Sequence, residues 1–386
     1  MSNVLEIYDG WLKDDSDVAA LVMRQWLVPV EGKDSVVFPP TYTLAETEIG
    51  DRFNKGEPIP GVYKGQNGPM GYNIDRFPDG TSVCLIDSVG SQANRMEPIF
   101  MRDRYKELVP QVVVKVVLEA GEQTVNLLEA GHRAADAIVR FSDLRQGLEE
   151  AFEAVRAGDA SKLAKIAPTS LVFGVWDSRG TQVKLPRIVR SVIRGFQVKP
   201  THRSAQYIPP IDYVGLGVLE APQEKKQQDA MSELGFSHAP APWTHGGVLV
   251  EGEIRRDAAL NFAALRALRA GDDTEILSLR RYILGLSLVA FTAPQETCLR
   301  EGCQLVPDPE RKPQWWLVRH DGGREEFTLT HEEALKYAEA AAEAFGVGPN
   351  REATFNPTAA RDELGKSKQE RKQARRGKST ESEASQ

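Results

Sequence analysis

The chain has 386 residues, of which 41% are hydrophobic and 27% charged, a balance typical of globular domains. No apolar run approaches the roughly 20 residues of a membrane span. The acidic start of the chain also lacks the apolar segment of a signal peptide, so we expect a cytoplasmic protein. The net charge of −7 argues against a nucleic-acid binder, whose domain is usually basic. A polyanion responds to the local field, however, so the distribution of charge along the chain matters more.

The first third of the chain predicts strands around a segment rich in Gly, Pro and Asn. Residues 18–30 form an apolar run that predicts a buried strand. Residues 31–80 contain so many breakers that we expect a loop-rich insertion. Residues 83–86, with Cys84 as packing, and residues 111–118 predict two more strands.

Periodicity and capping signals predict helices further along the chain. They lie at 142–157, with Ser142 as N-cap, at 257–270, at 274–290, and from the Thr330/Glu333 capping box to Gly346. Apolar runs at 171–176 and 248–254 predict strands between them.

This mixture of helices and strands, without strict alternation, predicts an α+β fold with insertions. A ferredoxin-like, or RRM-like, core fits the order of elements, although periodicity does not establish it. Residues 358–386 are polar and lack apolar periodicity, and they include the basic run 366–378. We therefore expect one domain, 1–357, followed by a disordered basic tail.

The most informative segment is 178–203, which has seven Lys or Arg residues and no Asp or Glu. The three arginines spaced i, i+3 and i+7 between Pro186 and Gly195 predict one basic face of a short helix. Nearby aromatic and amide groups add stacking and polar contacts, which favours a cradle for a nucleic-acid backbone. The alternative is a solvated face whose arginines pair with acids elsewhere. The candidate residues are Arg179, Lys184, Arg187, Arg190, Arg194, Lys199, His202, Arg203, Gln206 and Tyr207.

A second candidate site is the junction 87–95, where a strand runs into a helix. A helix N-terminus presents free N–H groups and partial positive charge, which suits a phosphate. Gly90 would let a ligand approach, and the neighbouring polar side chains are Ser91, Gln92, Asn94 and Arg95. The alternative is an ordinary capped helix. Pro98 would end or kink this helix.

Catalytic and metal-binding signatures are weak. The chain has no phosphate-binding loop, no G-x-S-x-G and no H-E-x-x-H, and Gly215 to Gly217 is only a fragment of a dinucleotide motif. His245 is most simply a loop histidine, and Cys298 and Cys303 are followed by no second pair at zinc spacing. We therefore expect no catalytic residue, no metal and no cofactor.

Five segments together resemble one known family. They are 37–42 (VFPPTY), 87–95 (DSVGSQANR), 132–136 (HRAAD), 176–187 (WDSRGTQVKLPR) and 203–207 (RSAQY). From about residue 18 to 345 the chain resembles the RAMP-superfamily backbone subunit, of the Cas-seven group, of type I-U (also called I-G) CRISPR systems.

The resemblance implies an RRM-like palm with large finger-like and thumb-like insertions, here 31–80 and the basic segment 178–210. It implies a non-enzymatic subunit of a Cascade complex in antiviral defence. Copies of the subunit would stack along the guide RNA (crRNA) as a helical filament and leave its bases free to pair with target DNA. The implied partners are other Cascade subunits (a large subunit and a fused five/six-type subunit), a helicase-nuclease recruited on target binding, and no membrane.

Two other classes of function remain open. Some relatives in type III systems cut RNA with a loop aspartate, so a ribonuclease acting on guide precursor or target RNA is the alternative. Asp34, Asp51 and Asp75 in the insertion are then the candidates, and no motif selects one. For a small-molecule enzyme we can assemble no site.

Overall fold

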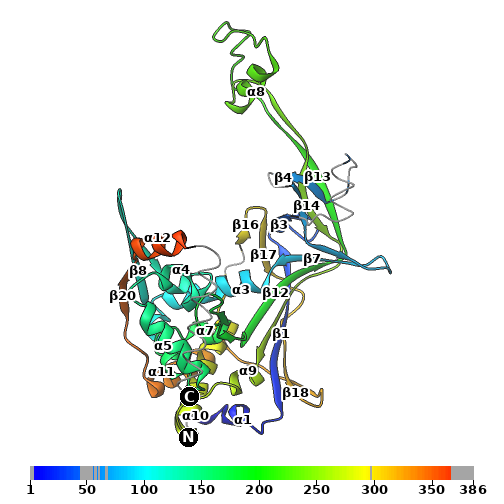
Figure 1. Cartoon of the computed structure of the whole chain (residues 1–386). Helices are drawn as coiled ribbons and strands as arrows, with labels where there is room; N and C mark the ends of the chain where they lie inside the picture. Colours follow the sequence, from blue (N-terminus) through cyan, green and yellow to red (C-terminus); the bar gives the residue numbers. More distant parts are fainter. Residues whose placement is uncertain are drawn as a thin grey trace.

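The computed structural model describes residues 4–43, 55, 59, 61–65, 68–295 and 298–366. Helices and antiparallel sheets both contribute heavily, which confirms the predicted α+β class. The chain builds a sheet with a helical layer on one side, and several strand-rich appendages extend from this body (Figure 1).

The described part of the chain forms a central nine-stranded sheet in which neighbouring strands run antiparallel. The main path has the order β16 (Cys298–Arg300), β17 (Cys303–Pro307), β1 (Val18–Pro29), β15 (Ile254–Asn261), β12 (Val189–Phe196), β7 (Ser82–Asp87) and β6 (Ile74–Arg76). Strand β18 (Gln314–Arg319) pairs with β1 and with β19 (Arg324–Glu326).

Alternation along β1 and β15 separates the two faces of this sheet. Leu21, Met23 and Leu260 are buried, whereas Arg24 and Arg255 on the other face stay partly exposed. This pattern is typical of an antiparallel sheet that is packed on one side and solvated on the other. We call the solvated side the open face.

Helices pack on the buried side of the sheet. They are α3 (Val89–Met96), α4 (Ala137–Arg140), α5 (Arg145–Arg156), α6 (Ser161–Ala164), α7 (Thr169–Phe173), α9 (Phe262–Arg266), α10 (Asp273–Thr292) and α11 (His331–Phe345), with α1 (Asp9–Leu12) near the N-terminus. Helix α10 is apolar on nearly every side because it is enclosed by the others. At Gly285 the backbone of α11 comes so close that a Cβ would lie 2.8 Å from the Cα of Ala338.

Short 3-10 helices connect these elements: Val4–Glu6, Glu97–Met101, Lys106–Leu108, Leu127–Glu129 and Arg133–Ala135. A second sheet joins β8 (Val112–Leu118), β9 (Gly121–Asn126) and β20 (Arg351–Thr354). Strands β10 (Val175–Trp176) and β11 (Lys184–Leu185) form a small hairpin.

Two of these appendages are small sheets. Strands β3 (Thr41–Thr43), β4 (Val62–Gly65) and β5 (Gly68–Tyr72) form one small sheet. Strands β13 (Val198–Tyr207) and β14 (Ala239–Val250) form a long hairpin that also holds β2 (Val36–Val37) and carries α8 (Lys225–Glu233) at its far end. Figure 1 shows this hairpin, residues 198–250, projecting away from the body, and we call it the arm.

Most predicted elements are confirmed. The strands at 18–30, 83–86 and 111–118 and the helices at 142–157, 274–290 and after Thr330 all exist, with boundaries shifted by a few residues. Ser142, however, does not cap α5, which starts at Arg145. Helix α3 ends at Met96, and Pro98 lies in the first turn of the 3-10 helix that follows, so it ends the α-helix rather than kinking it.

Three predictions were wrong. Residues 187–194 are not a helix, because from Val189 onward they belong to β12, a central strand between β15 and β7. The β-branched residues Val189, Val192 and Ile193 are buried in this strand and favour it over a helix. The predicted strand 171–176 is mostly α7, and the predicted helix at 257–270 begins only after β15, where the side chain of Asn261 caps α9.

The insertion and the tail are more regular than expected. Residues 31–80 contain β2, β3, β4, β5 and β6, while Asp51 lies outside the described residues. Residues Pro357–Gly365, expected at the start of a disordered tail, form α12 with Asn356 as N-cap. Residues 367–386, with most of the basic run, lie outside the described part.

Candidate nucleic-acid interface

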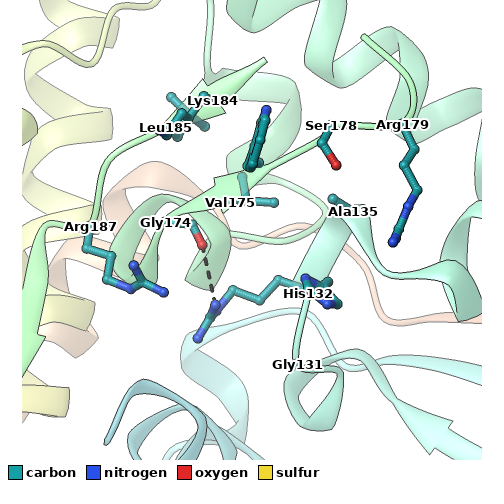
Figure 2. Close-up of a pocket in the computed structure, with 12 residues that line it drawn as sticks. Gly131, His132, Ala135, Gly174, Val175, Ser178, Arg179, Lys184, Leu185 and Arg187 are labelled. Carbon is teal, nitrogen blue, oxygen red and sulfur yellow. Dashed lines mark hydrogen bonds between the residues drawn. The ribbon is translucent and has the colours of Figure 1, made fainter. Parts of the chain in front are cut away.

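A cavity of about 350 Å³ opens between the 3-10 helix Arg133–Ala135 and the β10–β11 hairpin. Among the described residues its lining holds five basic or imidazole side chains and no carboxylate (Figure 2). We call it the basic cavity. Its lining residues are Gly131, His132, Arg133, Ala135, Gly174, Val175, Trp176, Ser178, Arg179, Lys184, Leu185 and Arg187.

The hairpin takes its shape from a buried carboxylate behind it. One oxygen of Asp177 accepts hydrogen bonds from the backbone N–H of Thr181 at 2.6 Å and from its hydroxyl at 3.0 Å. These bonds close the turn that carries Ser178 and Arg179. At Gly174 the backbone has φ +77, and a Cβ there would lie 2.9 Å from Cγ of Arg187, so glycine lets the two segments meet.

Arg133 is a charged wall residue that is only 3% exposed. Its guanidinium donates to the carbonyl of Gly174 at 3.4 Å, the dashed bond in Figure 2, and to Oδ1 of Asn94 at 3.3 Å. Its Nε lies 2.6 Å from Oε2 of Glu97, which is also buried. Burial raises the pKa of Glu97 to about 7, although the charge of Arg133 and a hydrogen bond from Thr169 oppose that rise.

The other cations of the cavity have no acidic partner in the part of the chain that the structure describes. Within the described residues, Arg179, Lys184 and Arg187 form no ion pair. Partial burial, together with the positive charges of Arg133 and Arg190, lowers the pKa of Arg187. These like charges face one another across a small space, so an anion entering the cavity would relieve their repulsion.

Two further arginines lie on β12, and Arg190 is near enough to Arg187 for its charge to contribute to the lowered pKa. Arg190 and Arg194 point to the open face, opposite Ala259 and Arg255 of β15. Neither arginine forms an ion pair in the described part of the chain. The predicted basic helix face therefore does not exist: Arg187 lines the cavity, while Arg190 and Arg194 lie on a neighbouring sheet surface.

At the start of α3 the predicted residues are held by a buried carboxylate. Asp87 accepts hydrogen bonds from Ser91 Oγ at 2.8 Å, Gln92 Nε2 at 2.7 Å and Arg95 Nε at 3.2 Å. Ser88 caps the helix, so the capped-helix interpretation describes this junction. Of the four residues predicted here, none lines the basic cavity, but Asn94 accepts a hydrogen bond from the wall residue Arg133.

Arg300 joins this cluster from β16, and its Nη2 lies 3.2 Å from Asp87. Arg95 and Arg300 both remain partly exposed, so two guanidinium groups share one carboxylate and leave a net positive charge. No sequence signal pointed to Arg300. Arg133 lies in one of the five segments that carry the family resemblance, which was the available signal for it.

The remaining predicted residues lie along the arm rather than at the cavity (Figure 1). Lys199 pairs with Glu251 at 2.5 Å, Arg203 lies over the ring of Phe38, and Tyr207 donates to the carbonyl of Gly235. His202 and Gln206 occupy the same strand, β13.

His245 and Cys84 both pack against neighbouring side chains. No group of three or more His, Cys, Asp or Glu side chains in the described part of the chain is placed to hold a metal. His245 packs edge-to-face against Tyr63 and Tyr72, and burial raises the pKa of the Cys84 thiol to about 12. None of the described helices is long and apolar enough to cross a membrane.

The molecule is thus an α+β protein with a cationic cavity whose lining, among the described residues, contains no carboxylate. Residues 21–200 match the model of a family described as CRISPR-associated protein GSU0053 (Cas_GSU0053). The matched segment begins in β1, ends in β13 and includes the whole lining of the basic cavity. This part of the chain is therefore similar to a CRISPR-associated protein family.

Proposed function

We propose that the protein is a guide-RNA-binding backbone subunit of a type I-U/I-G Cascade complex, in the RAMP superfamily. The observation that carries the proposal is the basic cavity, with neighbouring arginines that form no ion pair among the described residues, inside a segment that matches a CRISPR-associated family. In guide-directed systems base pairing reads the sequence, so the protein supplies charge and shape.

The charge arrangement supports a phosphate ligand. Five cations have no ion pair within the described residues and can meet an anion there: Arg179, Lys184, Arg187, Arg190 and Arg194. Much of the affinity of such sites comes from counterion release. The exposed indole of Trp176 adds a surface on which a base can stack. Cations and an aromatic ring together are the usual means of holding a single strand.

The architecture agrees with the proposed family. An antiparallel sheet with helices on one side and a solvated opposite face is the layout of an RRM-like palm. The β3–β5–β4 sheet then corresponds to the finger-like insertion and the arm to the thumb-like one. The expected partners are crRNA, target DNA paired with it, further copies of the subunit and the other Cascade subunits, and we expect no catalysis.

A direct test is equilibrium binding of fluorescently labelled guide RNA to the purified full chain, stripped of nucleic acid and checked by the 260/280 nm absorbance ratio. We expect tight binding that weakens steeply with salt and depends little on guide sequence. Absence of binding at low salt would contradict the proposal. Incubation of the complex with divalent metal tests the ribonuclease alternative, since that alternative requires cleavage products.

A further inference from the structure

A buried ion pair that the proposed function does not use lies behind the wall of the basic cavity. Glu97 and Arg133 are 1% and 3% exposed, and Oε2 of Glu97 lies 2.6 Å from Nε of Arg133. Arg133 lines the cavity, whereas Glu97 does not. The pair therefore places a carboxylate directly behind a cation of the cavity wall, where an entering ligand does not touch it.

The contact between the two groups leaves part of each unsatisfied. Within the described residues, Oε1 of Glu97 and Nε of Arg133 have no hydrogen-bond partner with good geometry. The other two guanidinium nitrogens donate elsewhere, to the carbonyl of Gly174 at 3.4 Å and to Oδ1 of Asn94 at 3.3 Å. A buried carboxylate with an unsatisfied oxygen is costly to keep ionised. Burial accordingly raises the pKa of Glu97 to about 7.

The charge that acts on Glu97 comes from Arg133. Helix α7 contributes Thr169, which is neutral and donates a hydrogen bond to Glu97. Helix α3 and the 3-10 helices Lys106–Leu108 and Leu127–Glu129 also pack against this segment. Their ionisable side chains are bound elsewhere or exposed: Arg95, Lys106, Glu107 and Glu129. Protonation of Glu97 would therefore leave the charge of Arg133 uncompensated at this position.

The protonation state of Glu97 decides the charge beside the cavity. When Glu97 is ionised, the pair with Arg133 is neutral, and when Glu97 is protonated, the pair carries one positive charge. This charge reaches the cavity, because Arg133 is near enough to Arg187 to lower its pKa. The affinity of the cavity for an anion should therefore be higher when Glu97 is protonated.

We propose that Glu97 sets how much of the positive charge of Arg133 reaches the basic cavity, and that an anion bound there drives a proton onto Glu97. This inference rests on the proposed RNA-binding function and adds a residue that acts on the strand without touching it. The bound phosphate is a second negative charge near the carboxylate, so it favours the protonated form. The proton comes from the solvent and stays on the carboxyl group of Glu97, while Arg133 remains charged.

The size of the effect follows from Coulomb's law. A unit charge roughly 8–12 Å from the bound phosphate, at an effective dielectric constant of about 20, changes the affinity by about 10- to 30-fold. The affinity should fall as pH rises from about 7 to about 9, because Glu97 loses its proton there in the free protein first. His132 also lines the cavity and gains charge in acid, so the pH profiles of matched variants have to be compared.

The test measures binding of a labelled oligoadenylate of about 15 nucleotides to the full chain at low salt, from about pH 6 to about pH 9. The bases of this RNA do not change protonation in that window. The variant Glu97→Gln keeps the shape of a protonated glutamate. The control Asp308→Asn removes another buried carboxylate, which lies outside the cavity lining. Calorimetry near pH 8 in two buffers of different ionisation enthalpy measures the protons taken up on binding.

We expect Glu97→Gln to bind the RNA about 10- to 30-fold more tightly than the wild type at about pH 9, and equally at about pH 6. The wild type should take up about 0.5 proton more than Glu97→Gln on binding. Asp308→Asn should follow the pH profile of the wild type. Circular dichroism checks that each variant is folded.

Parallel pH profiles of the wild type and Glu97→Gln, with equal proton uptake, would overturn the inference. An equal loss of affinity at every pH would overturn it too, since Glu97 would then have only a structural role. If Glu97→Gln did not fold, calorimetry on His132→Asn, which keeps Glu97, would decide: uptake of about 0.5 proton supports the inference, and its absence overturns it. If the wild-type chain bound no RNA at any pH, the proposed function itself would fail.

Discussion

Replacing Arg187, Arg190 and Arg194 with glutamate tests the central electrostatic claim. None of the three forms an ion pair within the described residues, so the substitution removes no stabilising partner and relieves repulsion around Arg187. We therefore expect a folded protein with severely weakened guide binding. The loss should be equal for unrelated guide sequences, because phosphate contacts carry no sequence information.

The magnitude follows from counterion release. For a single strand, each phosphate contact contributes about 0.7 to the slope of log K against log salt. Loss of three contacts should lower the slope by about 2.1, so between about 50 and 200 mM salt the wild type should lose roughly 18-fold more affinity than the triple variant does.

The structure also separates the contribution of the cavity from that of the open face. Arg187 lines the cavity, whereas Arg190 and Arg194 lie on the open face. Arg187→Glu alone should therefore lower the slope of log K against log salt by about 0.7, and the double variant Arg190→Glu/Arg194→Glu should lower it by about 1.4. An unchanged slope in the double variant would confine the RNA to the cavity.

The assay is fluorescence anisotropy with labelled guide RNA at several salt concentrations, with circular dichroism as a check on folding. A matched control replaces three exposed arginines that have acidic partners: Arg104, Arg145 and Arg319. The control should retain most of its affinity and its slope. A folded triple variant of Arg187, Arg190 and Arg194 with the wild-type slope would refute the reasoning and turn attention to the cluster at Arg95 and Arg300.

Three further predictions concern assembly, the tail and pH. Static light scattering should show RNA-dependent oligomers, and a strict one-to-one monomeric complex would contradict the filament. Deletion of 358–386 should leave folding and guide binding largely intact, because α12 has no buried residue and the basic run should add only weak, salt-sensitive affinity; loss of assembly would contradict this. The raised pKa of Glu97 means that the native state holds its proton more tightly than the unfolded chain, so stability should fall as pH rises from about 4.5 to about 7 and level off above. Urea unfolding across this window should show that fall in the wild type and less of it in Glu97→Gln, and equal slopes would contradict the assignment.

Sequence patterns predicted the fold where local and tertiary preferences agree. The capping box at Thr330 and the apolar run of α10 specify helices that the structure contains. The arginines at 187, 190 and 194 have helical spacing, yet the intervening Val189 and Ile193 are needed in the centre of the sheet, and this tertiary position decided the outcome.

The candidate site was predictable in part for a related reason. Arg179, Lys184 and Arg187 lie close together in the sequence, so a local excess of charge revealed them. Arg133 and Asn94 come from distant segments and meet them only through the packing of α3 and the 3-10 helix. The carboxylate of Asp87 likewise holds Ser91, Gln92 and Arg95, which the sequence alone presented as available to a ligand.

The overall acidity of the chain is compatible with RNA binding because its charges are distributed unevenly. Many arginines outside the cavity are paired, as in Arg24 with Asp257 and Arg281 with Asp9, and these contribute little to the distant field. At physiological salt the Debye length is about 8 Å, so acids elsewhere on the surface are largely screened from a phosphate at the cavity. A phosphate there would meet Arg179, Lys184 and Arg187, which form no ion pair within the described residues, and the net charge of −7 has little influence on its binding.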